Sequence, residues 1–276
     1  MSELNSGKGH RDENFPVASL LLKREYRAPI LAFYKFARAA DDIADHPSVS
    51  KEEKLARLAD MRAGLTGEGI PEAMALAETA RVRGLDLIHA QELLDAFVQD
   101  VTVQHYADWE ALIGYCRLSA MPVGRFVLDV HGEDRSIWPL SDALCAALQV
   151  INHLQDCGKD YRAINRVYVP IGRLEALGIG VEALAEPLAS PELRRVITGL
   201  AEQTLLLLQR SAPFAAHIRD RRLSAEVAVI QALAEDLARL LLRRDPLSER
   251  VHHSKAGSAW LAAGALLRHT IARGRA

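Results

Sequence analysis

The sequence has little cysteine, and the cysteines form no pattern. Its 276 residues contain only Cys116, Cys145 and Cys157, and there is no C-x-x-C pair. An odd, sparse set of thiols argues against a disulfide framework and against a structural zinc site. All three lie among apolar residues with helical spacing. We therefore expect buried free thiols in a reducing, cytoplasmic setting.

Glycine-rich nucleotide motifs are also missing. The chain has no G-x-G-x-x-G, no G-x-x-x-x-G-K-S/T and no G-x-S-x-G, which mark dinucleotide sites, P-loops and hydrolase elbows respectively. The formal net charge is only −2, and the basic clusters at 219–222 and 243–244 are short. This balance argues against nucleic acid as the main partner.

Long hydrophobic runs are absent as well. Residues 1–13 contain no apolar core of a signal peptide, and we expect them to be flexible. The longest apolar stretch near the C-terminus, 259–267, is far shorter than the ~18–20 residues that a membrane span requires. Arg268, Arg273 and Arg275 follow it. We therefore expect the C-terminal segment to form a helix that packs on the core. Peripheral contact with the inner face of the membrane is an alternative that the sequence leaves open.

What the sequence does have is helical periodicity almost throughout. Apolar residues recur at intervals of three and four, and the best strand-like piece, 166–170, is too short to found a sheet. We predict an all-α fold in which residues 1–276 form a single helical domain. The expected helices are 17–28, 29–45, 51–66, 72–82, 87–103, 108–132, 140–162, 171–177, 192–211, 214–221, 224–243 and 248–272.

An acidic motif at 41–45 is the first functional signal. Asp41 and Asp45 lie four residues apart, which places them on one face of a helix, and Asp42 adjoins them. Like charges at that spacing repel by roughly 0.2–0.5 kcal/mol per pair, so on an otherwise apolar helix they need a compensating cation. Alone, however, such a motif is more often a solvated helix face or a cap.

A second acidic stripe further along the chain favours a metal site. Gln149, Asn152, Asp156 and Asp160 step by three, four and four, so they line one helix face. Carboxylate and amide oxygens without a Cys or His cluster favour Mg²⁺, which commonly bridges carboxylates to a phosphate. We predict two Asp-rich helices that face one another in the bundle and bind Mg²⁺ and a diphosphate.

Two further side chains are candidates for chemistry. Arg38 lies three residues before Asp41 on the same face, where it could bind a diphosphate oxygen or simply pair with Asp41 or Asp42. Tyr115, taken without context, is a packed core aromatic. The sequence does not choose between these alternatives.

One proline and two histidines also allow predictions about local structure. Pro122 follows a run of small residues and predicts a kink. His131 and His153 are unclustered, so we interpret both as packing or local hydrogen-bonding residues.

At these motifs the sequence resembles the squalene and phytoene synthase family, all-helical head-to-head prenyl synthases with two aspartate-rich motifs. The segment that begins Asn14-Phe-Pro-Val-Ala-Ser19 and continues through Phe33-Tyr34, Arg38 and Asp41-Asp42 resembles the family's opening. The pair Tyr115-Cys116 resembles its catalytic helix. The second acidic stripe with Arg166-Val-Tyr168, and Ser248-Glu-Arg250 with Lys255, resemble later motifs.

Departures from the family pattern indicate a subgroup. Gln155 and Lys159 stand where the family usually has Arg and Glu, and Ser119-Ala-Met-Pro122 replaces Val-Ala-Gly. The pieces at 13–19 and 155–162 are similar to bacterial hydroxysqualene synthases of hopanoid pathways. That resemblance implies presqualene diphosphate as the substrate, water as the final nucleophile and hydroxysqualene as the product.

The resemblance also implies a site and its cofactors. It implies an isoprenoid-synthase-type bundle with a central apolar tunnel, dependence on Mg²⁺ and no use of NADPH. The implied catalytic residues are Tyr115, Arg38 and Asn152; the substrate-binding residues are Asn14, Tyr34, Arg38, Gln149, Asn152, Tyr168, Arg250 and Lys255; the metal ligands are Asp41, Asp42, Asp45, Asp156 and Asp160.

Three alternatives stay open. One is a squalene or phytoene synthase that joins two prenyl diphosphates such as farnesyl diphosphate. Another is a non-catalytic assembly or binding member of the family, and other squalene-pathway enzymes would be partners in either case. A di-metal carboxylate bundle would require Glu-x-x-His pairs, which the two stripes lack.

Overall fold

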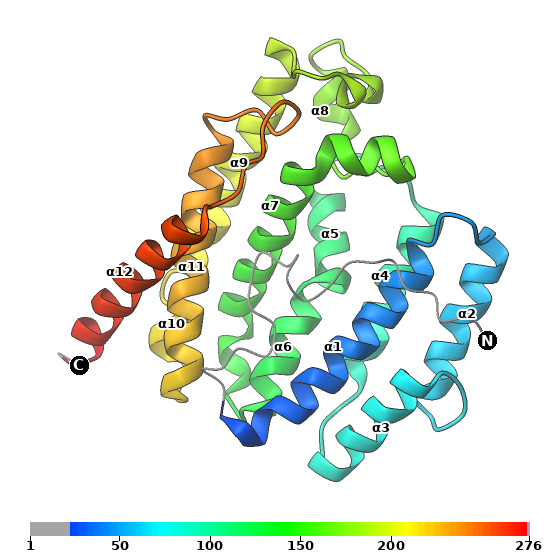
Figure 1. Ribbon diagram of the computed structural model, residues 1–276, viewed down its shortest axis with the longest axis vertical. Helices are drawn as coiled ribbons and strands as arrows, with labels where there is room; N and C mark the ends of the chain where they lie inside the picture. Colours follow the sequence, from blue (N-terminus) through cyan, green and yellow to red (C-terminus); the bar gives the residue numbers. More distant parts are fainter. Residues whose placement is uncertain (1–22, 275–276) are drawn as a thin grey trace. The chain divides into compact units, whose positions relative to one another are not determined.

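The computed structural model describes residues 23–274, and the regular elements in that range are helices (Figure 1). Within these residues the β-type pairing is one isolated parallel bridge between His105 and Val167, so the prediction of an all-α fold is confirmed. The chain divides into two compact units, one formed by residues up to 103 with 118–135 and the other by 104–117 with 136 onward.

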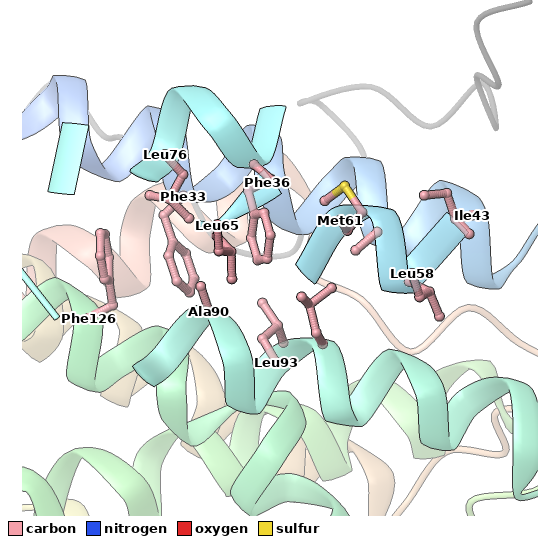
Figure 2. Packing of buried hydrophobic residues seen from close by; sticks show 13 residues of the cluster. Phe33, Phe36, Ile43, Leu58, Met61, Leu65, Leu76, Ala90, Leu93 and Phe126 are labelled. Carbon is pink, nitrogen blue, oxygen red and sulfur yellow. The ribbon is translucent and has the colours of Figure 1, made fainter. Parts of the chain in front are cut away.

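In the described part of the first unit, five helices surround an apolar core. The helices are α1 (Arg24–Ala44), α2 (Lys51–Gly64), α3 (Pro71–Arg83), α4 (Ile88–Thr102) and α6 (Met121–Val130). Figure 2 shows Phe33 and Phe36 of α1 pointing toward Leu93 of α4, with Phe126 beside them. The rings of Phe33 and Phe126 stack with centroids 4.2 Å apart, so one face of α1 is held firmly in this core.

The second unit is organised around its longest helix. That helix, α7 (Trp138–Ile164), packs against α9 (Pro191–Ser211) and α11 (Arg221–Leu241), and α12 (Lys255–Gly274) lies along α11 (Figure 1). The shorter elements are α5 (Trp109–Ser119), α8 (Ile171–Glu175), α10 (Phe214–His217), η1 (Arg135–Ile137) and η2 (Val181–Ala185). The last two residues of α5 are assigned to the first unit.

The first predicted helix boundary, at Pro29, is wrong for a tertiary reason. The proline lies inside a continuous α1 instead of between two helices. A proline in a helix leaves the carbonyl four residues earlier without its usual donor. Here that carbonyl belongs to Glu25, and Arg83 of α3 donates to it at 2.6 Å. The neighbouring helix therefore supplies the missing hydrogen bond.

Pro122 behaves as local rules predict. The expected helix 108–132 divides into α5 and α6 at Ala120, whose φ of −124° is non-helical. Pro122 then occupies the first turn of α6, where a backbone N–H would have no helical partner anyway. By length and composition alone, Trp109–Val130 could cross a membrane, and 44% of that apolar window is buried inside the protein.

Candidate active site

The first acidic motif lies on one side of α1. Tyr34, Arg38, Asp41 and Asp45 are spaced by four, three and four, so they form one stripe, and all four are half-buried. The opposite side of α1 packs into the core of the first unit. Because that side is fixed, the polar stripe is held at the edge of the core with little freedom to rotate.

Arg38 joins two of the carboxylates. Its Nη1 lies 2.6 Å from Asp41 Oδ2, and its Nη2 lies 2.9 Å from Asp42 Oδ1. One guanidinium thus offsets the repulsion between adjacent acids. Of the two alternatives that the sequence left open, the ion pair is present. A guanidinium has several N–H donors, so the predicted diphosphate contact is compatible with this pairing.

Asp45 occupies the end of α1. It is the C-cap residue, and its backbone N–H donates to Asp41 O at 2.9 Å. A helix C-terminus carries partial negative charge, so a carboxylate there is unfavourable unless a cation is near. Lys54 Nζ donates to the neighbouring Ala44 carbonyl at 2.9 Å. This end of α1 is therefore a place where added positive charge is stabilising.

The second acidic motif lies on α7. Gln149, Asn152, Asp156 and Asp160 are all half-buried on this helix, whose other side packs on α9 and α11. Their oxygens are the ligands that hard cations prefer. Among residues 23–274, no three His, Cys, Asp or Glu side chains close into a metal-binding cluster. Each pair supplies carboxylates that could hold a Mg²⁺ ion whose coordination water or phosphate oxygens would complete.

The cysteines supply no ligand to such a site. All three are free thiols, as the sequence predicts; Cys116 and Cys157 are buried, whereas Cys145 is only half-buried, which contradicts the prediction of burial for that residue. Burial raises the pKa of Cys116 to about 12, and burial likewise raises the pKa of Cys157, one residue after Asp156, to about 12. Both therefore stay protonated and unreactive near neutral pH.

The segment that follows α7 pairs with the segment before α5. Asn165 ends the helix in the left-handed conformation, with φ 51° and ψ 40°, which Asn tolerates better than most residues. The backbone N–H of Val167 then donates to Gln104 O at 3.0 Å. This pairing brings Arg166 and Tyr168 beside the segment that leads into α5.

A buried aromatic cluster forms at that point. Tyr115 Oη lies 3.4 Å from Tyr168 Oη, and Arg166 Nη1 donates to Tyr168 Oη at 3.3 Å. The ring of Tyr106 stacks on Tyr168 with centroids 5.7 Å apart. The structure therefore brings together two predicted site residues, Tyr115 and Tyr168, that are 53 positions apart in the chain.

His153 is packed in the same cluster, in agreement with the interpretation of its sequence pattern. Its ring stacks on Tyr168 at a centroid distance of 3.4 Å and an angle of 16°. Burial, and secondarily the charge of Arg166, lowers the pKa of His153 to about 3. Within the described residues its Nε2 has no hydrogen-bond partner. The imidazole is thus neutral near neutral pH, and one of its ring nitrogens can accept a hydrogen bond.

A signal for His153 was present in the sequence. Gln149, His153, Asp156 and Asp160 are spaced by four, three and four, so His153 belongs to the acidic face of α7. The sequence around His153 contains no other histidine, and its aromatic partners Tyr115 and Tyr168 come from distant segments. The spacing therefore indicated the helix face of His153 but not its partners.

The late basic residues lie at the surface of the second unit. Arg250 and Lys255 are exposed, and Lys255 is the first residue of α12. Gln155 Nε2 donates to Val251 O, which ties this segment to α7. Burial first, and the charge of Arg250 second, lowers the pKa of His252. Asn14, the remaining predicted site residue, lies outside the described residues.

The two acidic faces belong to different compact units. Asp41 and Asp45 are in the first unit, and Asp156 and Asp160 are in the second. That these faces oppose one another across a tunnel stays a prediction from the sequence.

Comparison with known proteins adds a family match. A family model for squalene/phytoene synthase matches residues 9–257. The chain is 57% identical over 263 residues to a hydroxysqualene synthase of Zymomonas mobilis, covering 94% of this chain and 89% of that protein. It is 55% identical over 253 residues to a hydroxysqualene synthase of Rhodopseudomonas palustris, covering 91% and 87%. The crystal structure of squalene synthase HpnC from Alicyclobacillus acidocaldarius aligns with TM-score 0.72 and 31% identity, covering 82% of this chain and 87% of that one.

Proposed function

Because the chain belongs to the squalene/phytoene synthase family, we propose that it converts presqualene diphosphate and water to hydroxysqualene and diphosphate. The observation that carries this proposal is the similarity, over nearly the whole chain, to two hydroxysqualene synthases. The residues of the two acidic faces have the chemistry that such a reaction needs.

The four paired aspartates are the proposed metal ligands. Asp41 and Asp45 on α1, and Asp156 and Asp160 on α7, would hold Mg²⁺, with Asp42 as an outer helper. Bound Mg²⁺ would offset the charge of the diphosphate and stabilise its departure. The half-buried positions of these carboxylates support this role, since partly desolvated carboxylates gain most from a bound cation.

Arg38 and Tyr115 are the proposed catalytic groups beside the metal ligands. Arg38 would bind the leaving diphosphate, for which its planar N–H donors are suited. Tyr115, buried against Tyr168, would orient the diphosphate or relay a proton near it. Asn152 and Gln149 contribute amide contacts from the acidic face of α7.

The remaining proposed contacts are with the substrate. These residues are Asn14, Tyr34, Tyr168, Arg250 and Lys255. Apolar helix faces would shield the cation that forms when the diphosphate leaves, because excluding bulk water limits premature quenching. One admitted water would then capture the cation, and no NADPH would be consumed. We place the enzyme in the cytoplasm, with access to other squalene-pathway enzymes.

The test is a product analysis with two substrates. Purified protein is incubated with Mg²⁺ and presqualene diphosphate, or separately with farnesyl diphosphate, in ¹⁸O-water, with and without NADPH. We expect ¹⁸O-labelled hydroxysqualene from presqualene diphosphate alone, regardless of NADPH. An unlabelled hydrocarbon that requires NADPH would identify a squalene synthase. No product from either substrate would favour a non-catalytic binding member.

A further inference from the structure

Ser119, the last residue of α5, has a buried hydroxyl group. Within the described residues, its Oγ has no hydrogen-bond partner. Two other buried hydroxyls on helices bond to a carbonyl of the preceding turn. Thr204 Oγ1 donates to Leu200 O at 2.8 Å, and Ser211 Oγ donates to Leu208 O at 3.1 Å. Because a buried polar group is costly unless it is hydrogen-bonded, a small polar molecule bound at Ser119 Oγ would be stabilising.

The break between α5 and α6 provides a second acceptor beside this hydroxyl. Pro122 has no N–H, so it cannot supply the hydrogen bond that a continuous helix would give to the carbonyl of Leu118, four residues earlier. Ala120 lies between them and leaves the helical conformation, with φ −124° and ψ −44°. Residues 118–122 all belong to the first unit. The Leu118 carbonyl and Ser119 Oγ are thus on adjacent residues, and both can accept a hydrogen bond.

These two acceptors suit one water molecule. A buried water makes roughly three hydrogen bonds to otherwise unsatisfied polar groups. If one hydrogen of the water is donated to Ser119 Oγ and the other to Leu118 O, the lone pairs of the water oxygen point away from both groups. A water held in this orientation is ready to form a bond to an electron-deficient carbon.

Ser119 lies one helical turn from Tyr115, which we propose to act beside the diphosphate. The two residues are four apart on α5, so they share a face of this helix and their Cβ atoms are about 5–6 Å apart. Because this spacing is a property of one helix, it does not depend on the arrangement of the two units. A water bound at Ser119 would therefore be near the cation that forms when the diphosphate leaves.

We propose that Ser119 holds the water that captures the carbocation, and that its hydroxyl thereby decides that the product is an alcohol. This inference rests on the proposed function and names the group that selects its product. The water oxygen uses one lone pair to form the new C–O bond. The resulting oxonium ion loses one proton to the released diphosphate, which has kept the electron pair of the broken C–O bond. Presqualene diphosphate and water thus give hydroxysqualene and protonated diphosphate without an oxidant or a reductant.

The experiment compares threonine and valine at position 119, because the two side chains have nearly the same shape and only threonine has a hydroxyl. Wild type, Ser119→Thr and Ser119→Val are each incubated with presqualene diphosphate and Mg²⁺ in ¹⁸O-water. The measurements are diphosphate release and the fraction of the products that is ¹⁸O-labelled hydroxysqualene. Thr204→Val is the matched control, because it removes a buried hydroxyl from α9.

We expect labelled hydroxysqualene as the main product of the wild type, Ser119→Thr and Thr204→Val. Ser119→Val should lower the ratio of hydroxysqualene to the other products by about tenfold, the scale for losing one hydrogen bond to the attacking water. The cation should instead lose a proton to the diphosphate and give a polyene. Ser119→Val should still release diphosphate, because the cation forms before the water attacks.

Three outcomes would overturn the role of Ser119 and leave the proposed function intact. One is the same fraction of labelled hydroxysqualene from Ser119→Val and Ser119→Thr. Another is an equal change of product in Thr204→Val. The third is a Ser119→Val protein that unfolds in urea like the wild type but releases no diphosphate, because Ser119 would then act before the cation forms.

A second variant keeps the comparison decisive if Ser119→Val does not fold. Ser119→Ala also removes the hydroxyl, and it is compared with Ser119→Thr by the same two measurements. Wild-type protein that gives no labelled hydroxysqualene would instead refute the proposed function, and the role of Ser119 with it.

Discussion

Replacing His153 with Phe should make the protein more resistant to acid. The folded protein holds this imidazole neutral, with its pKa lowered from 6.5 to about 3. Below pH 6.5 the unfolded chain takes up a proton at His153 and the folded chain does not. Unfolding is therefore favoured progressively as pH falls from 6.5 toward 3. Phe preserves the stack on Tyr168 and removes the titrating group.

The size of the effect follows from the pKa difference. From pH 6.5 to pH 5 is 1.5 pH units, and each unit corresponds to about 1.36 kcal/mol when only the unfolded state is protonated. The wild type should therefore lose about 2 kcal/mol more unfolding free energy than His153→Phe between pH 7 and pH 5. This difference in unfolding free energy needs no reduction for solvent screening, because the His153 ring is buried among aromatic side chains.

The assay is urea unfolding of both proteins at several pH values between 7 and 5, with the difference in unfolding free energy plotted against pH. His217→Phe is the matched control, because His217 is exposed on α10. It makes the same substitution at a surface position, so any change that it causes measures the effect of the substitution itself. If His153→Phe and the wild type lose stability in parallel, then His153 is solvated or already protonated in the folded protein, and our account of the aromatic cluster is wrong.

Four other outcomes are expected. Chelation by EDTA should abolish turnover and added Mg²⁺ should restore it; activity that persists in EDTA would contradict a metal site. Asp41→Asn and Asp156→Asn should each lower kcat by at least about 10²-fold, the scale for losing a main electrostatic stabiliser, and near-normal rates in both would refute the two-motif site. Arg38→Lys should impair turnover although it retains the charge, because a lysine cannot form the fork to Asp41 and Asp42 or to a diphosphate; wild-type kinetics would leave Arg38 as a structural ion pair only. Arg83→Ala should lower the unfolding free energy by about 0.5–1.5 kcal/mol, because it removes the donor to the Glu25 carbonyl, and urea unfolding that matches the wild type would show that this contact is dispensable.

The helical fold and the two acidic faces follow from the periodicity of residues within single helices. A helix repeats every 3.6 residues, so the positions of Asp41 and Asp45, or of Asp156 and Asp160, on a shared face follow from spacing alone. The same rule holds for the apolar face that packs α1 into its core. Motif order along the chain then sufficed to predict the family that the comparison shows.

Local rules were less informative wherever a distant segment supplied a partner. Pro29 predicted a helix end, but α1 continues because Arg83, 58 residues away from Glu25, completes its hydrogen bonding. His153 looked isolated for the same reason, since Tyr115 and Tyr168 come from separate segments. No spacing rule could indicate that its pKa falls, because desolvation depends on what surrounds a side chain in space.

Sequence alone therefore determined the helical class, the family motifs and the residues that share each helix face, since these depend on the periodicity of a single segment. Only the tertiary structure decided the environment of those residues. It established that Arg38 joins Asp41 and Asp42 in one ion-pair network and that a neutral His153 lies against Tyr168. It also left Trp260 on the outside of α12, because α11 covers the opposite face. These outcomes depend on burial and on contacts between distant segments, which periodicity within one helix does not encode.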